Sequence, residues 1–162
     1  MFDELKGLIE NNLAEEASDL LDEMIEKNEM VDKEYLLEIL LKSKNPNLRN
    51  SIAFALSDLG VEEVVEPIIT LLKSPETLGH RGSLLGALEP FNYVNHAELL
   101  VDYFLNGNYE VSRRSYSLLE PILDQITVKD KEKFARKIEE KIEDLEIELD
   151  FLKDTVELFE SE

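Results

Sequence analysis

The sequence of 162 residues has the length of one domain, and its 37 Asp and Glu outnumber 17 Lys and Arg, for a formal charge of −20 at pH 7. This charge argues against binding to nucleic-acid phosphates or to an anionic membrane surface, and it leaves a basic protein or peptide as a suitable partner. Hydrophobic residues amount to 43%, enough to bury a core, and the absence of Cys excludes disulfides, thiolate metal sites and Cys nucleophiles.

Apolar residues recur at spacings of three and four along most of the chain, which predicts helices rather than strands. Turn-forming residues such as Asn45-Pro46 and Ser74-Pro75 separate the helical segments. Gly60 and Asn92 are expected at helix ends, in the left-handed backbone conformation. We therefore expect an all-α chain with helices over residues 2–11, 13–28, 32–43, 46–59, 61–73, 78–91, 94–105, 109–126 and 129–159.

The first residues, Met1-Phe2-Asp3-Glu4-Leu5, lack the basic start and the long apolar run of a secretory leader. No later segment approaches 18 consecutive apolar residues, the length that a membrane-spanning helix needs. These two observations predict a cytoplasmic protein.

A repeat with a period of 32 residues underlies the helices. Arg49, Arg81 and Arg113 lie one period apart, and the apolar segments 36–40, 68–72 and 100–104 share one register. Because a helix pair cannot bury its apolar face alone, neighbouring pairs are expected to stack into an α-solenoid, with Leu56, Leu72, Leu88 and Phe104 buried. The predicted single domain, residues 1–162, comprises a cap helix (1–12), three repeats (13–44, 45–76 and 77–108), and a degenerate repeat with an acidic C-terminal capping helix (109–162).

The unit at 45–76 combines a turn Pro, the step Leu48-Arg49, an Ala-rich helix through Ala53 and Ala55 that ends near Gly60, and an apolar second helix. In these features residues 13–126 resemble short HEAT-like repeats. The resemblance implies that the second helices line a concave binding surface. It also implies that Arg49, Arg81 and Arg113 form a structural ladder with carboxylates between repeats. The end units depart from the pattern, with Ser112 before the last Arg and Ala17 where the first Arg is expected.

The polar side of the second helices repeats acidic residues. Glu34, Glu66 and Glu98 are one period apart, and a second row lies four residues later. Positions i and i+4 share one side of a helix. The pattern predicts a two-column acidic patch across three repeats, whose candidate partner-binding residues are Glu34, Glu38, Glu66, Glu98 and Asp102. The alternative is an ordinary solvated helix surface.

The C-terminal segment carries a heptad seam, which consists of Ile138, Ile142, Leu145, Leu149, Leu152, Val156 and Phe159. We expect this helix to cap the last repeat of a monomer and to lay its seam on the solenoid core. A coiled-coil dimer is the alternative. Ile147, Phe151 and Leu158 argue against the dimer, because they are expected to widen the apolar stripe beyond the narrow seam of a two-stranded coil.

No motif of catalysis is present, and His80 and His96 do not form a metal-binding pair on one helix face. We therefore expect no enzyme activity, no cofactor, no catalytic residues and no metal site. The predicted function is a non-catalytic protein-interaction scaffold whose acidic concave face recognises a basic protein or peptide. The alternatives are an immunity-type inhibitor or nucleic-acid mimic that neutralises a basic toxin or nuclease, and an enzyme with an unrecognised carboxylate site.

Overall fold

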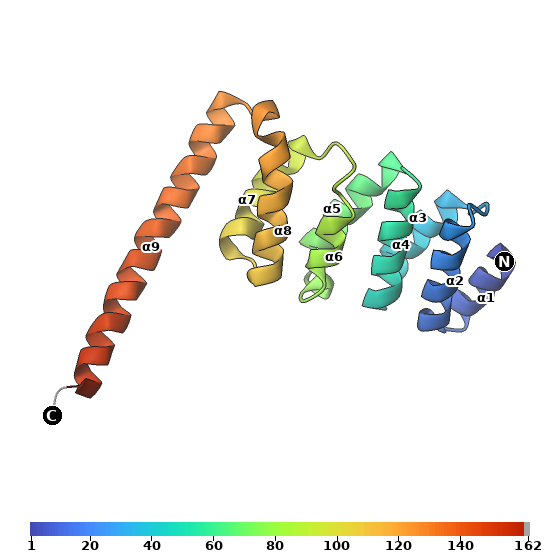
Figure 1. The fold of residues 1–162 in the computed structure, drawn as a ribbon, viewed down its shortest axis with the longest axis horizontal. Helices are drawn as coiled ribbons and strands as arrows, with labels where there is room; N and C mark the ends of the chain where they lie inside the picture. Colours follow the sequence, from blue (N-terminus) through green and yellow to red (C-terminus); the bar gives the residue numbers. More distant parts are fainter. Residues whose placement is uncertain (161–162) are drawn as a thin grey trace.

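The computed structural model describes residues 1–160, which form helices and turns without a β-strand (Figure 1). The α-helices of this part of the chain are α1 (Phe2–Glu10), α2 (Ala14–Glu26), α3 (Lys33–Lys42), α4 (Pro46–Asp58), α5 (Val65–Lys73), α6 (Arg81–Gly86), α7 (Ala97–Asn106), α8 (Tyr109–Leu119) and α9 (Val128–Glu160). Short 3-10 helices cover Glu62–Val64, Pro75–Thr77, Val94–His96 and Glu120–Gln125. The all-α prediction is confirmed.

The predicted helices over residues 78–91 and 109–126 are the ones that the structure shortens most. α6 ends at Gly86, and α8 gives way to a 3-10 helix after Leu119. Pro90 and Pro121 account for both differences, because a Pro has no N–H to donate to the carbonyl four residues earlier. The presence of these two prolines in the predicted segments 78–91 and 109–126 already indicated that the helices would end or kink there.

The helices form a row two layers deep (Figure 1). In one layer α2 packs on α4, α4 on α6, and α6 on α8, while α3 and α5 contact each other in the second layer. The layers are joined within consecutive pairs such as α3 with α4 and α7 with α8. Each pair therefore buries its apolar sides against the pairs before and after it.

The core runs continuously between the two layers. Leu56, Leu72 and Leu88 are fully buried, as predicted. Phe104 is the exception, because it is only partly buried and its ring lies 6.0 Å from that of Tyr116, whose side chain is half exposed. The prediction that Phe104 belongs to the buried core is therefore wrong. The row ends at α7 and α8, so no further pair covers this position.

Helix ends use residues that tolerate a positive φ. Gly60 follows α4 with φ 64°, and Asn12 and Asn28 follow α1 and α2 with φ 58° and 53°. Gly and Asn reach this region at low steric cost. The prediction for Gly60 is confirmed and that for Asn92 is wrong. The Asn92 side chain instead accepts a hydrogen bond from the Val94 N–H at 3.3 Å.

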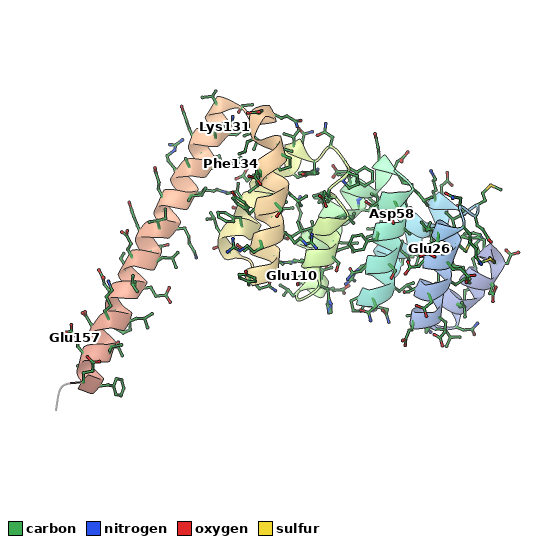
Figure 2. The ribbon with its side chains drawn as sticks, in the orientation of Figure 1. Glu26, Asp58, Glu110, Lys131, Phe134 and Glu157 are labelled. Atoms are coloured by element: carbon green, nitrogen blue, oxygen red, sulfur yellow. The ribbon has the colours of Figure 1, made fainter. Side chains whose placement is uncertain are left out.

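The C-terminal helix packs on the row with its first turns only. Phe134 is buried, and it faces α7 and α8 (Figure 2), whereas the seam from Ile142 to Phe159 is 49–88% exposed. The prediction that the whole seam lies on the core is therefore wrong. α9 has 33 residues, or about 50 Å of helix, while α7 has 10, or about 15 Å, so α9 extends beyond the surface that it covers (Figure 1).

None of the helices within residues 1–160 has the length and the apolar character that crossing a bilayer requires.

The buried Leu residues provide a direct test of this packing. Leu56→Ala and Leu88→Ala should each lower the free energy of unfolding by about 2–5 kcal/mol, because the lost methyl groups leave a cavity. Urea denaturation followed by circular dichroism measures the change. Met30→Ala is the control, since Met30 is 91% exposed and its truncation should change stability by less than about 0.5 kcal/mol. Equal stability of all three variants would contradict the packing.

Candidate functional site

The predicted acidic residues lie on α3, α5 and α7, which correspond to the second helices of the predicted units 13–44, 45–76 and 77–108. Glu34, Glu66 and Glu98 each occupy the first turn of their helix. The helix dipole stabilises a carboxylate at this end. The 32-residue recurrence of Glu therefore has a local cause in helix stability, besides any role in recognition.

The acidic residues on α3 and α5 are accessible to solvent. Glu34 is exposed, the Glu38 side chain is 55% exposed, and that of Glu66 is 75% exposed. Glu38 pairs with Lys42 one turn later, and Glu66 Oε1 lies 2.8 Å from Nε2 of His96, which precedes α7. Glu34, Glu38 and Glu66 are called the acidic face below.

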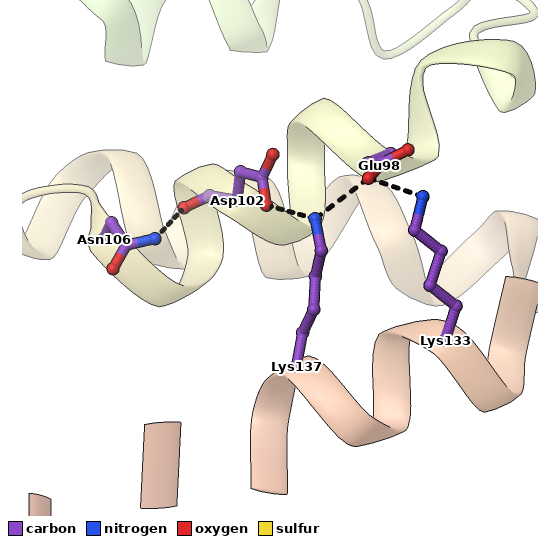
Figure 3. A network of polar contacts seen from close by, with 5 residues as sticks. All are labelled: Glu98, Asp102, Asn106, Lys133 and Lys137. Carbon is purple, nitrogen blue, oxygen red and sulfur yellow. Dashed lines mark hydrogen bonds and ion pairs between the residues drawn. The ribbon is translucent and has the colours of Figure 1, made fainter. Parts of the chain in front are cut away.

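The acidic residues on α7 are engaged by lysines of α9 (Figure 3). Glu98 Oε1 lies 2.7 Å from Lys133 Nζ and 2.9 Å from Lys137 Nζ. Lys137 Nζ also lies 2.8 Å from Asp102 Oδ1. We call these four residues the lysine clasp. Side chains spaced by four residues on α7 face side chains spaced by four residues on α9. The lysine clasp therefore fixes the start of α9 to α7.

The clasp changes the electrostatics of its members. Hydrogen bonds from Lys133 and Lys137 lower the pKa of Glu98 to about 2, and bonds to Asp102 and Glu98 raise the pKa of Lys137. Two of the five predicted partner-binding residues are thus neutralised within the chain. The acidic columns therefore do not present one uniform patch, because lysines of α9 bind the α7 members, whereas the α3 and α5 members lie away from these lysines.

Sequence reasoning missed the clasp because its partners are 35 to 39 residues apart. One signal was present. Lys133, Lys137 and Lys141 repeat at steps of four, as do Glu98, Asp102 and Asn106 on the opposite helix, and Lys141 Nζ lies 3.4 Å from Asn106 Oδ1. A row of Lys on one helix and a row of hydrogen-bond acceptors on another, both with a spacing of four residues, indicate that the two helices can pack side by side.

The predicted arginine ladder binds backbone carbonyls rather than carboxylates. Arg49 Nη1 donates to the Ser43 carbonyl at 3.4 Å, and Arg81 Nη2 donates to the Ser74 carbonyl at 3.0 Å. Ser43 and Ser74 are the C-terminal cap residues of α3 and α5, where free carbonyls and the helix dipole favour a cation. Within residues 1–160 no carboxylate lies within 4 Å of the charged nitrogens of these arginines.

The three arginines differ in their surroundings. Arg49 is 2% exposed, and burial lowers the pKa of its guanidinium. Arg81 also stacks on the Tyr103 ring, 5.1 Å from its centroid. Arg113 is exposed and lies over the Tyr109 ring, and Ser112 Oγ donates to the Phe104 carbonyl of α7 instead, at 2.7 Å. The ladder therefore has two members that cap helices.

An apolar groove of 430 Å³ separates the end of the row from α9. Val101 and Phe104 of α7, Tyr116 and Leu119 of α8, and Ile138 of α9 contribute to its walls. The groove is continuous with the heptad seam, since Ile138 belongs to both. It explains why Phe104 is not fully buried.

In the part of the chain that the structure describes, no group of three or more His, Asp or Glu residues converges to hold a metal ion. The ionisable groups with definite partners, Glu98 and Lys137 above all, form intrachain ion pairs on the surface.

No family model matches this chain, and the comparisons with curated proteins and with solved structures found no match.

The clasp should weaken in acid. A carboxyl whose pKa falls from 4.5 to about 2 on folding contributes stability that is complete above pH 4.5 and disappears as the pH falls to about 2. Because the chain has no Cys, spin labels at Ser117→Cys and Asp144→Cys can report the distance between α8 and α9. We expect the distance distribution to broaden over this pH range. In Glu98→Gln it should be broad already at pH 7; distributions that are equally narrow in both proteins at pH 7 would contradict the clasp.

The helix-capping role of the arginines predicts unequal effects of their removal. Arg81→Met should lower the free energy of unfolding by on the order of 1 kcal/mol, because the Ser74 carbonyl loses a charged donor. Arg113→Met, at an exposed position, should change it by less than about 0.5 kcal/mol. Thermal and urea unfolding of the two variants measure the difference, and a larger loss in Arg113→Met would count against the capping role.

Proposed function

We propose that this chain is a non-catalytic protein-interaction scaffold whose acidic face binds a basic protein segment. The observation that carries the proposal is the exposure of Glu34, Glu38 and Glu66 on two neighbouring helices of one layer, in a chain of charge −20. A field of one sign attracts an oppositely charged partner and raises its association rate. The absence of Cys suits a scaffold that acts in a reducing compartment such as the cytoplasm.

The proposal includes an α-solenoid of HEAT-like units with a 32-residue period. Equivalent contacts of Arg49 and Arg81 support it, since each caps the second helix of the preceding unit. Equal burial of Leu36, Ile68 and Leu100, one period apart, supports it as well. In a solenoid, corresponding helices of successive units line one extended surface. The acidic face would then belong to the concave side.

Lys and Arg side chains of a partner suit this face. The intrachain partners of Glu38 and Glu66 are an exposed Lys and a largely buried His, and both carboxylates remain more than half exposed, so an incoming cation can reach them. Exposed ion pairs contribute little affinity each, and they act mainly on association rate and selectivity. The partner is therefore expected to carry several basic residues in a row, with apolar contacts supplying further affinity.

The test uses a fluorescent peptide rich in Lys and Arg, with binding followed by anisotropy. The double variant Glu34→Lys and Glu66→Lys should weaken binding at least tenfold, because it inverts the field of the acidic face. Binding to the parent should also weaken as salt rises, since exposed charges are screened over about 8 Å at physiological ionic strength.

The matched control is Glu15→Lys with Glu16→Lys, which makes the same change in net charge at exposed positions of α2, in the other layer. This control should retain most of the affinity. Equal losses in the two double variants would show that the peptide responds to net charge alone, which would refute recognition by the acidic face.

A further inference from the structure

The outer part of α9 presents an apolar stripe to solvent. In heptad notation, Ile142, Leu149 and Val156 occupy position a, and Leu145, Leu152 and Phe159 occupy position d. Their exposed fractions range from 49% for Ile142 to 88% for Phe159. The side-chain hydrogen bonds and ion pairs described for residues 142–157 all lie within α9. Such a stripe is unfavourable in water unless another surface covers it.

The residues at these positions are typical of coiled coils. Apolar side chains at positions a and d insert between the residues of a facing helix. Leu149 and Leu152, at positions a and d, lie at the centre of the exposed stretch.

The other apolar residues of the outer part of α9 do not argue against a two-stranded coil. At about 100° per residue, Ile147, Phe151 and Leu158 lie on average roughly 150° from the centre of the seam. They occupy nearly the opposite side of α9 and do not widen the stripe, so that expectation from the sequence is wrong. The seam has the narrow form that a two-stranded coil requires.

We propose that this stripe binds the same stripe of a second copy of the chain, in an antiparallel two-stranded coiled coil. The pairing aligns Leu149 with Leu152 of the second copy, Leu145 with its Val156, and Ile142 with its Phe159. Each layer occurs twice by symmetry, so six layers of apolar side chains close the interface. The interface is separate from the acidic face and does not depend on the proposed function.

The position of the helical row selects the antiparallel orientation. Ile138, the seam residue that precedes Ile142, lines the groove against α7 and α8, so the seam side of α9 faces the row. A parallel second helix would continue along the seam into the space that α7 and α8 occupy. An antiparallel helix ends opposite Ile142, before it reaches the row, and its own row lies beyond the free end of α9, near Glu157 (Figure 2).

Charges beside the seam are compatible with this register. In an antiparallel pair the e positions of the two helices face each other, which places Glu146 beside Lys153 of the second copy at the centre of the interface, twice by symmetry. At each end of the interface, Glu139 of one copy faces Glu160 of the other, and these two carboxylates repel each other. The central attraction lies where the apolar layers exclude most water.

Self-association through α9 and binding of a basic partner should depend on salt concentration in opposite directions. Each copy carries a charge of −20, so the copies repel each other until salt screens the repulsion. Self-association should therefore strengthen with salt, whereas binding of a basic ligand to the acidic face should weaken. The two proposals can fail independently.

Sedimentation equilibrium of the full chain at 0.05 and 0.5 M NaCl tests the proposal. We expect a species of twice the 18.6 kDa chain mass, with tighter association at the higher salt concentration. The variant Leu149→Glu and Leu152→Glu should raise the dissociation constant at least a hundredfold, because it places four carboxylates in the central layers. A chain that stays monomeric at both salt concentrations would overturn the proposal.

The matched control is Ile147→Glu with Phe151→Glu, which adds the same charges to the other side of the same helix. It should dimerise nearly as well as the parent, and circular dichroism should show equal helix content in all variants, since all four positions are at least half exposed. An equal loss of dimer in the control would overturn the assignment of the seam as the interface.

Charge exchange tests the orientation. Glu146→Lys alone and Lys153→Glu alone should each weaken the dimer several-fold, and the double exchange should restore it, because the antiparallel partners would again be opposite in sign. In a parallel coil the facing pairs would be Lys141 with Glu146 and Glu148 with Lys153, and the double exchange would make both pairs repulsive. Failure of the double exchange to restore the dimer would overturn the antiparallel arrangement.

Discussion

The burial of one apolar side per helix pair is the constraint on which this structure depends. Each pair is too small to enclose a core, so stability comes from packing α2 on α4, α4 on α6 and α6 on α8, and from the side chains between the layers. A row built this way must end. At the end, α9 covers part of α7 and α8 with Phe134 and binds Glu98 with Lys133 and Lys137. The way in which α9 covers the end of the row decides which surfaces remain accessible to solvent.

The few Lys and Arg side chains of this acidic chain make contacts between its helices. The sequence has 17 Lys and Arg against 37 carboxylates, and the ion pairs within residues 1–160 involve only six of these carboxylates. Four basic residues contact helix ends or acidic residues of another helix. Arg49 and Arg81 cap α3 and α5, and Lys137 bridges Glu98 and Asp102. The acidic face on α3 and α5 is what this distribution leaves accessible.

The two proposed surfaces bind through different forces and lie on different parts of the molecule, the acidic face within the row of helices and the outer seam of α9 beyond it. The acidic face attracts through charge and is sensitive to salt screening, whereas the outer seam of α9 associates through apolar burial against electrostatic repulsion. A dimer joined through α9 would carry two acidic faces on one rigid frame. A basic partner with two binding segments would then gain affinity from the high local concentration of the second face.

The sequence by itself determined the helices and most of the core, because apolar spacing, caps and prolines act within a few residues of chain. The positions of Leu56, Leu72 and Leu88, the left-handed Gly60 and the recurrence of Glu34, Glu66 and Glu98 all follow from such local patterns. Only the tertiary structure decided that Glu98 and Asp102 are bound by α9, that Phe104 borders a groove, and that the seam beyond Ile138 has no surface to cover it. These outcomes depend on where a row of helices stops and at what angle the last helix leaves it, and residues 30 or more positions apart decide both.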